Sequence, residues 1–153
     1  MPEMPEVQGL VDFLGARLTG LAITQARISA ISALKTYDPP IDALVGAHVE
    51  SVVRRGKFVD IATDAGAHLV FHLAKAGWLR WHDALPTTVI KPGRSPIALR
   101  VGFADGSGFD LTEAGTKKSL AVSVVREPDE VPGIARLGPD PLDPAFTRDA
   151  LAK

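Results

Sequence analysis

The first twenty residues follow the spacing of a helix. Apolar side chains between positions 5 and 18 recur three and four residues apart, so they share one helical face. They are Val7, Leu10, Val11, Leu14 and Leu18. Pro5 and Glu6 suit a first turn, where a missing N–H is harmless and a negative charge meets the helix dipole. Gly20 suits the end. The pattern predicts one amphipathic helix over residues 5–18.

The rest of the chain alternates in the manner of β-strands. Short runs of β-branched and apolar residues are interspersed with polar ones and separated by turn-forming residues. The predicted strands cover residues 21–31, 47–53, 58–63, 68–73, 78–82, 97–103, 108–111 and 120–125. Turns are indicated at 64–66, 91–94 and 105–108. We therefore expect a mainly β fold, a sandwich of two antiparallel sheets with about eight strands and the helix against one end.

Composition narrows the class of protein. The 153 residues are 46% hydrophobic and 23% charged, which is ordinary for a globular domain. No apolar run is long enough to cross a bilayer, and the first residues lack the features of an export signal. The absence of cysteine excludes disulfides and cysteine-ligated metals. We expect a soluble cytoplasmic protein whose chain binds no metal or other cofactor. Since its net charge is −1, any site for a polyanion must be a local patch.

The first three residues carry candidate chemistry. Met1 is normally removed before a proline, which leaves Pro2 with a secondary amine. An α-amino group titrates near about 8, so part of it is nucleophilic at neutral pH. Its attack on an aldehyde carbon gives an iminium ion that cannot lose its charge by deprotonation at nitrogen, and this favours β-elimination. Glu3 can move protons in those steps. Taken alone, the pair is a weak signal, because many proteins begin with Met-Pro and most such termini are inert.

Four segments, in order, resemble the formamidopyrimidine-DNA glycosylase / endonuclease VIII family, whose members are bifunctional base-excision repair enzymes with an N-terminal proline nucleophile. The opening Pro2-Glu3-Met4-Pro5-Glu6-Val7 resembles the start of that family. Residues 54–61 resemble its basic hairpin, and residues 72–80 resemble the strand–turn–strand that carries its first void-filling residue. Residues 137–142 are similar to the segment that closes its N-terminal domain. The resemblance extends over essentially all 153 residues and implies the same two-sheet sandwich.

The resemblance also implies roles for individual residues. Pro2 would be the Schiff-base nucleophile at the sugar C1′, Glu3 the proton shuttle and Lys57 the hairpin lysine. Glu6 matches a second acidic position. The positions expected at the DNA are Arg55, His72, Lys75, Lys117 and Lys118. We expect a monomer whose partner is damaged double-stranded DNA. Its expected location is the nucleoid. The target base would be flipped out, because Pro2 cannot reach C1′ inside an intact duplex.

Two departures from the family pattern change the expectation. The family fills the void left by the flipped base with methionine, arginine and phenylalanine, but here Lys75, Gly115 or Thr116, and Lys117 stand at those places. Ammonium groups favour phosphate over wedging between bases, so we expect altered lesion choice or weaker reading of the opposite base, with Pro2 chemistry retained.

The second departure is length. Residues 1–136 would form the glycosylase-like domain and residues 137–153 a connection toward a helical DNA-binding domain, where any zinc would belong. The basic residues by themselves are also typical of solvated turns. The alternative function is therefore a non-catalytic DNA-binding module with the same fold.

Overall fold

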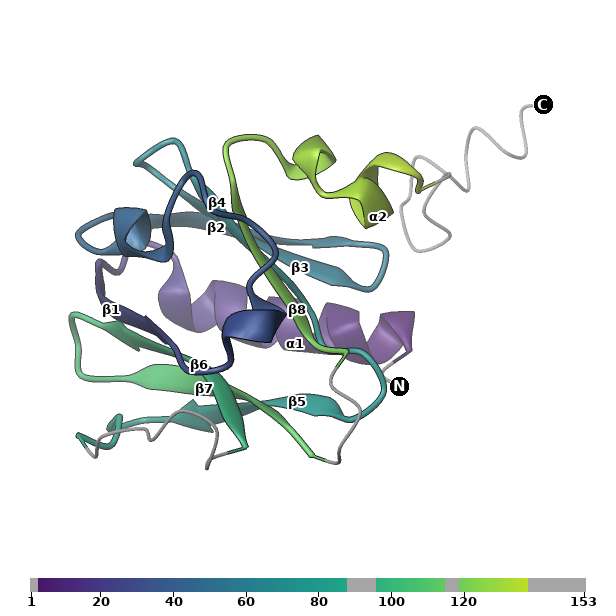
Figure 1. Cartoon of the computed structure of the whole chain (residues 1–153). Coiled ribbons are helices and arrows are strands. Elements are labelled where there is room, and N and C mark those ends of the chain that lie inside the picture. Colours follow the sequence, from purple (N-terminus) through teal and green to yellow (C-terminus); the bar gives the residue numbers. More distant parts are fainter. Residues whose placement is uncertain (1–2, 88–95, 115–118, 138–153) are drawn as a thin grey trace, which may run out of the picture.

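The computed structural model describes residues 3–87, 96–114 and 119–137, and it confirms the predicted sandwich (Figure 1). One sheet has the order β1-β6-β7-β5 and the other β2-β3-β4-β8, and all pairs are antiparallel. The strands are β1 (Ile23–Ile28), β2 (Val49–Arg55), β3 (Phe58–Thr63), β4 (His68–His72), β5 (Gly77–His82), β6 (Ile97–Phe103), β7 (Gly108–Glu113) and β8 (Ala121–Val125). The helices are α1 (Met4–Leu18), α2 (Pro132–Ala135) and three short 3₁₀ turns, η1 (Ile31–Ala33), η2 (Ile41–Leu44) and η3 (Pro128–Glu130).

The core lies between the two sheets. Phe71 of β4 and Phe103 of β6 both pack against Phe109 of β7, with ring centroids 6.1 and 6.0 Å apart. Each such fully buried side chain contributes about 1.5–3 kcal/mol relative to exposure. Every residue of β7 is buried, including those that point away from the core. Polar side chains and Leu85 cover the outer face of this strand. The alternation of residues along the sequence does not reveal this covering.

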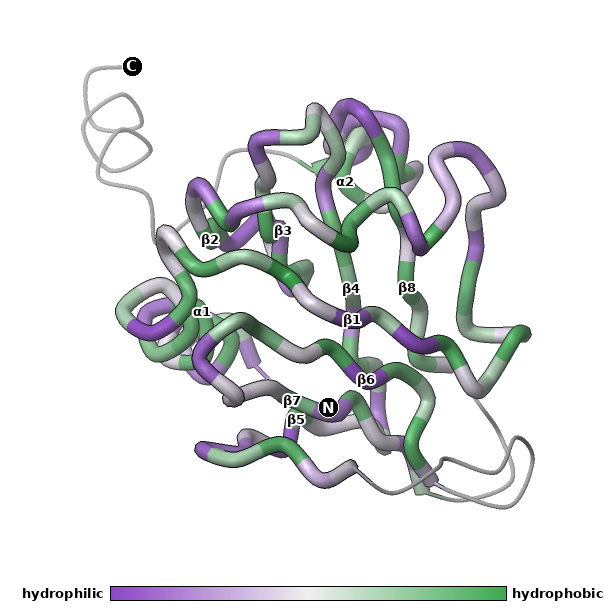
Figure 2. Tube along the Cα trace, turned by 90° about the vertical axis from the view of Figure 1, so that its left-hand side faces the viewer, coloured by the Kyte–Doolittle hydropathy of each residue, from purple (hydrophilic) through white to green (hydrophobic). Residues whose placement is uncertain are grey.

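Helix α1 runs along a side of the sandwich, and this differs from the expected position at one end. It lies beside β2, an edge strand, and the N–H of Gly20 donates to the carbonyl of Val49 at 2.8 Å. The ring of Phe13 packs in a T-shaped arrangement against that of Trp81, with ring centroids 5.6 Å apart. Trp81 belongs to β5, the edge strand of the other sheet. Figure 2 looks nearly along α1 and shows it beside both sheets. The apolar face of the helix therefore closes one open side of the core, and its first residue stands beside the β2–β3 hairpin.

The tight turn between β4 and β5 leaves no room for a side chain at Gly77. A Cβ at Gly77 would lie 2.2 Å from the carbonyl oxygen of Leu73, so we expect Gly77→Ala to destabilise the fold by about 2–3 kcal/mol. Gly9→Ala is the matched control. A Cβ there meets nothing within 4 Å, so the helix should gain about 0.5–1 kcal/mol. Urea unfolding measures both changes, and equal stabilities would show that the turn tolerates a side chain.

The C-terminal part of the described chain covers the outer face of the second sheet. Val131 and Ile134 form a small apolar cluster with Val70 of β4 and Val125 of β8, and Phe58 packs against it. Leu137 lies over Gly56 in the β2–β3 turn. Residues 138–153 fall outside the described residues, so the boundary at 137 stays a prediction. No helix of the described part is long and apolar enough to cross a membrane.

Candidate functional site

Glu3 is the N-cap residue of α1, and its side chain lies beside Lys57 of the β2–β3 turn. Its backbone is extended, with φ −84° and ψ 162°, and its carbonyl accepts a hydrogen bond from the N–H of Val7 at 3.0 Å. Its carboxylate makes no capping hydrogen bond and is 69% exposed. One carboxylate oxygen, Oε2, lies 3.7 Å from Nζ of Lys57. Since the helix does not use this carboxylate, it is available for proton transfer beside a cation.

Lys57 is held at the tip of the β2–β3 hairpin. Arg55 pairs with Phe58, so Gly56 and Lys57 form a two-residue turn. Gly56 has a φ of +62°, a left-handed conformation that suits glycine at the first central position of a tight hairpin turn. The turn places the Lys57 side chain, which is 29% exposed, against the start of α1. Glu3 and Lys57, which are far apart in sequence, are thus neighbours in the fold.

His72 belongs to the same cluster. It ends β4, is half-buried, and its ring packs on Phe58 with centroids 5.0 Å apart. Burial lowers the pKa of His72 below its usual value, and the positive charge of Lys57 acts in the same direction. Nδ1 accepts a hydrogen bond from the backbone N–H of Ala74 at 3.1 Å. At neutral pH the ring is therefore uncharged with its proton on Nε2, a hydrogen-bond donor suited to a phosphate oxygen.

Arg55 is engaged within the fold. Its Nε donates to Oδ2 of Asp60 at 2.8 Å, and Asp60 is almost fully buried. The same carboxylate lies 2.7 Å from Nδ1 of His68. A buried carboxylate therefore balances the charge of Arg55, which leaves less positive potential for DNA than the run Arg54-Arg55-Gly56-Lys57 suggested. Its predicted role at the DNA stays a prediction.

The remaining candidates occupy different surroundings. Lys75 is exposed on the β4–β5 turn, directly after Ala74, whose φ is +59°. Glu6 is exposed on the first turn of α1. Pro2, Lys117 and Lys118 lie outside the described residues. Glu113 was not singled out in the sequence, yet its buried Oε2 accepts the N–H groups of Ser119 and Leu120, each at 2.8 Å, and so joins the two flanks of residues 115–118.

Arg54 is the functional candidate that sequence reasoning missed. It is 8% exposed, its Nε donates to Oε1 of Gln8 at 2.8 Å, and its Nη1 donates to the carbonyl of Gly56 at 2.9 Å. The alternation of side chains along a strand indicates that one of the two arginines is buried, because consecutive residues on β2 point to opposite faces. Arg54 and Arg55 therefore cannot both project into solvent from one side of the hairpin.

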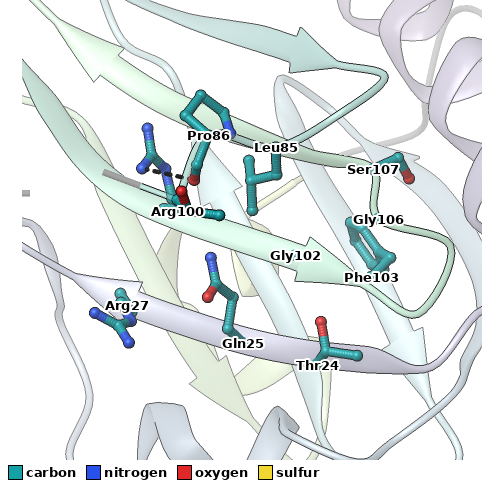
Figure 3. A pocket seen from close by; sticks show the side chains of 11 residues that line it. Thr24, Gln25, Arg27, Leu85, Pro86, Arg100, Gly102, Phe103, Gly106 and Ser107 are labelled. Carbon is teal, nitrogen blue, oxygen red and sulfur yellow. Dashed lines mark hydrogen bonds between the residues drawn. The ribbon is translucent and has the colours of Figure 1, made fainter. Parts of the chain in front are cut away.

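A cavity of about 250 Å³ lies elsewhere, between β1, β6 and residues 85–87 (Figure 3). Arg100, which lines it, is bound by Asp110 through two hydrogen bonds of 2.7 and 2.9 Å and donates to the carbonyl of Pro86 at 3.4 Å. His82 also lies 3.0 Å from the carboxylate of Asp110. None of the candidate residues in the described part lines this cavity. The polar groups that line this cavity belong to the outer face of the sheet and not to the cluster that contains Glu3.

Comparison with known proteins gives the family. A family model described as the formamidopyrimidine-DNA glycosylase N-terminal domain matches residues 1–118. The formamidopyrimidine-DNA glycosylase of Desulforamulus reducens is 35% identical over 159 residues, which cover 100% of this chain and 54% of that protein. The enzyme of Salinispora arenicola is 32% identical, with 98% of this chain and 52% of that protein covered. This chain thus spans about half the length of the relatives that it matches.

Solved structures agree on the fold. Lactococcus lactis formamidopyrimidine-DNA glycosylase, bound to DNA containing an abasic site, superposes with a TM-score of 0.75 at 22% identity. The superposition covers 98% of this chain and 57% of that chain. The same enzyme in complex with DNA containing FAPY-dG also gives 0.75 at 22% identity, with 99% and 57% covered. The matched sequence and the shared sandwich together show that this chain belongs to the formamidopyrimidine-DNA glycosylase family, with the fold of its N-terminal domain.

Proposed function

We propose that this chain is a base-excision repair DNA glycosylase with AP lyase activity, acting on damaged double-stranded DNA. The observation that carries the proposal is the placement of the Glu3 carboxylate 3.7 Å from the Lys57 ammonium, at the residue that directly follows Pro2. The names of the relatives and the damaged DNA in the Lactococcus lactis complexes support it. A monomer that works at the nucleoid in the cytoplasm and needs no cofactor bound by this chain is part of the same proposal.

The proposed chemistry assigns one task to each residue. The unprotonated amine of Pro2 attacks C1′, and the base leaves with the electron pair of the glycosidic bond and takes up the proton that the attacking nitrogen loses. Glu3 delivers a proton to the sugar ring oxygen as the ring opens, which yields an iminium ion between Pro2 and C1′. Loss of a proton from C2′ then expels the 3′ phosphate by β-elimination, and water hydrolyses the iminium to free the amine. Lys57 and the Nε2–H of His72 hold backbone phosphates beside this site.

Borohydride trapping tests the proposal. The chain, shown by intact mass to lack Met1, is incubated with a duplex containing one abasic site and sodium borohydride. We expect a covalent adduct that peptide mapping assigns to Pro2. A chain in which a retained residue precedes Pro2 has a tertiary amide there, so it should bind the duplex and form no adduct. Salt-sensitive DNA binding without an adduct at a free Pro2 would refute the enzyme and establish the non-catalytic DNA-binding module.

A further inference from the structure

Arg54 connects the two elements that carry Glu3 and Lys57. Its Nε donates to Gln8 on α1, five residues beyond Glu3, and its Nη1 donates to the carbonyl of Gly56. That carbonyl belongs to the peptide bond that leads directly into Lys57. A single planar guanidinium therefore connects the first turns of the helix with the tip of the hairpin. Its donors are held in a rigid plane, whereas the ammonium of a lysine sits on a flexible chain.

Both ends of this connection are fixed. Nε2 of Gln8 donates to Oδ1 of Asp12 at 2.9 Å, so the amide oxygen of Gln8 faces Arg54. On the hairpin side, Leu137 packs against Gly56 from outside the turn. Arg54 itself is 8% exposed, so water competes little for its hydrogen bonds. The path Asp12–Gln8–Arg54–Gly56 thus joins α1 to the β2–β3 turn through partners with defined orientations.

We propose that Arg54 is a positioning residue that sets the separation between Glu3 and Lys57. The inference rests on the proposed function. The distance from Nζ of Lys57 to Oε2 of Glu3 is 3.7 Å, so a small shift of the helix relative to the hairpin separates the pair. A misplacement of about 1 Å at a reacting group can cost about 10²-fold in rate. Arg54 acts through Gln8 and Gly56 and does not itself meet the DNA.

Gln8 allows the mildest test, because it can be changed without creating a cavity. Gln8→Met keeps the length of the side chain but removes both the acceptor for Arg54 and the donor to Asp12, whereas Gln8→Glu removes only the donor to Asp12 and keeps the acceptor for Arg54. In single-turnover trapping at saturating abasic duplex, we expect Gln8→Met to be about tenfold slower and Arg54→Leu about 10- to 100-fold slower. Gln8→Glu should stay within about threefold of the wild-type rate, and the duplex Kd of all three variants should change little.

Thr63→Val is the matched control for a purely structural effect. Thr63 is buried and donates to the carbonyl of Ala67 at 2.7 Å, at the end of the β2–β3 hairpin opposite to Gly56. Its loss removes a buried hydrogen bond across the β3–β4 turn, at the far end of β3 from Gly56, but leaves the connection to α1 intact. At a temperature where every variant is folded, Thr63→Val should trap DNA at the wild-type rate.

Amide hydrogen exchange separates this inference from the proposed function, since it needs no activity. The N–H of Val7 bonds to the carbonyl of Glu3, and Phe58 pairs with Arg55 across the turn. The backbone amides of Val7 and Phe58 should exchange with solvent several-fold faster in Gln8→Met and Arg54→Leu than in the wild type. In Thr63→Val and Gln8→Glu they should exchange at the wild-type rate. If the wild type forms no adduct, the proposed function fails and exchange alone decides whether Arg54 joins the two elements. Unchanged exchange in Arg54→Leu, or trapping by Gln8→Met at the wild-type rate, would overturn the inference.

Discussion

Glu3→Gln is expected to slow the covalent capture of abasic-site DNA by about 10²–10⁴-fold at neutral pH, the range that a positioned general acid or base contributes. The amide occupies the same volume but neither accepts nor delivers a proton at the sugar ring oxygen. The carboxylate is free for this work because it makes no capping hydrogen bond on α1 and is 69% exposed. Single-turnover rates on an abasic duplex, with and without borohydride, measure the change.

The control for Glu3→Gln is a second carboxylate with the same charge and no place in the cluster. Glu50 is exposed on β2, the strand that runs beside α1, and Glu50→Gln should leave the rate unchanged. Glu3 is a mostly exposed partner of Lys57, so its ion pair contributes only about 0–1 kcal/mol and the fold should persist in the variant. A Glu3→Gln rate within about threefold of wild type would show that the carboxylate moves no proton in the slow step.

Asp110→Ala is expected to lower the free energy of unfolding by about 3–5 kcal/mol, the cost of leaving one partner of a buried ion pair alone. The carboxylate accepts two hydrogen bonds from Arg100, whose side chain is 5% exposed, and a third contact comes from His82. Urea unfolding at pH 7 measures the loss. Replacing Asp110 and Arg100 together by leucine should recover much of it, because no buried charge is then left unpaired. Equal losses in the single and double variants would contradict this account.

Acid should reduce the difference between wild type and Asp110→Ala. Burial raises the pKa of Asp110, but the hydrogen bonds from Arg100 and His82 outweigh burial, and the pKa lies below its ordinary value. A carboxyl group with a lowered folded-state pKa stabilises the fold fully above its unfolded-state pKa, which is about 3.9. This stabilisation is lost as the pH falls from there through the folded-state pKa. The difference between the unfolding free energies of wild type and Asp110→Ala should therefore be smaller at pH 3 than at pH 7.

Local patterns in the sequence were sufficient for most elements of the fold. The helical spacing of Val7, Leu10, Val11, Leu14 and Leu18 predicted α1 within one residue, and the alternation predicted β3 and β6 with the bounds that the structure shows. These patterns succeed because one face of each element must be buried and the period of that face is set by backbone geometry. The strand β7 extends to Glu113, two residues beyond the prediction, since Thr112 and Glu113 pair with β5.

The candidate site was predictable in its members but not in its arrangement. Residue types and the family resemblance pointed to Glu3, Lys57 and His72, and the structure places these three together. The same reasoning placed Arg55 at the DNA and gave Arg54 no role of its own, whereas the fold buries Arg54 against Gln8 and pairs Arg55 with Asp60. Partners 46 and 5 residues apart cannot be read from a basic run, because they depend on which faces the helix and strands present to each other.

The sequence by itself determined the helix, the alternation of the strands, the glycine turn before Lys57 and the proline–glutamate start, all of which depend on neighbours within a few positions. Only the tertiary structure decided that α1 closes the side of the sandwich, that Glu3 meets Lys57, and that Arg100 and His82 share the carboxylate of Asp110. Such contacts join segments far apart in the chain. Their energies come from burial and charge pairing, which exist only after the sheets have packed.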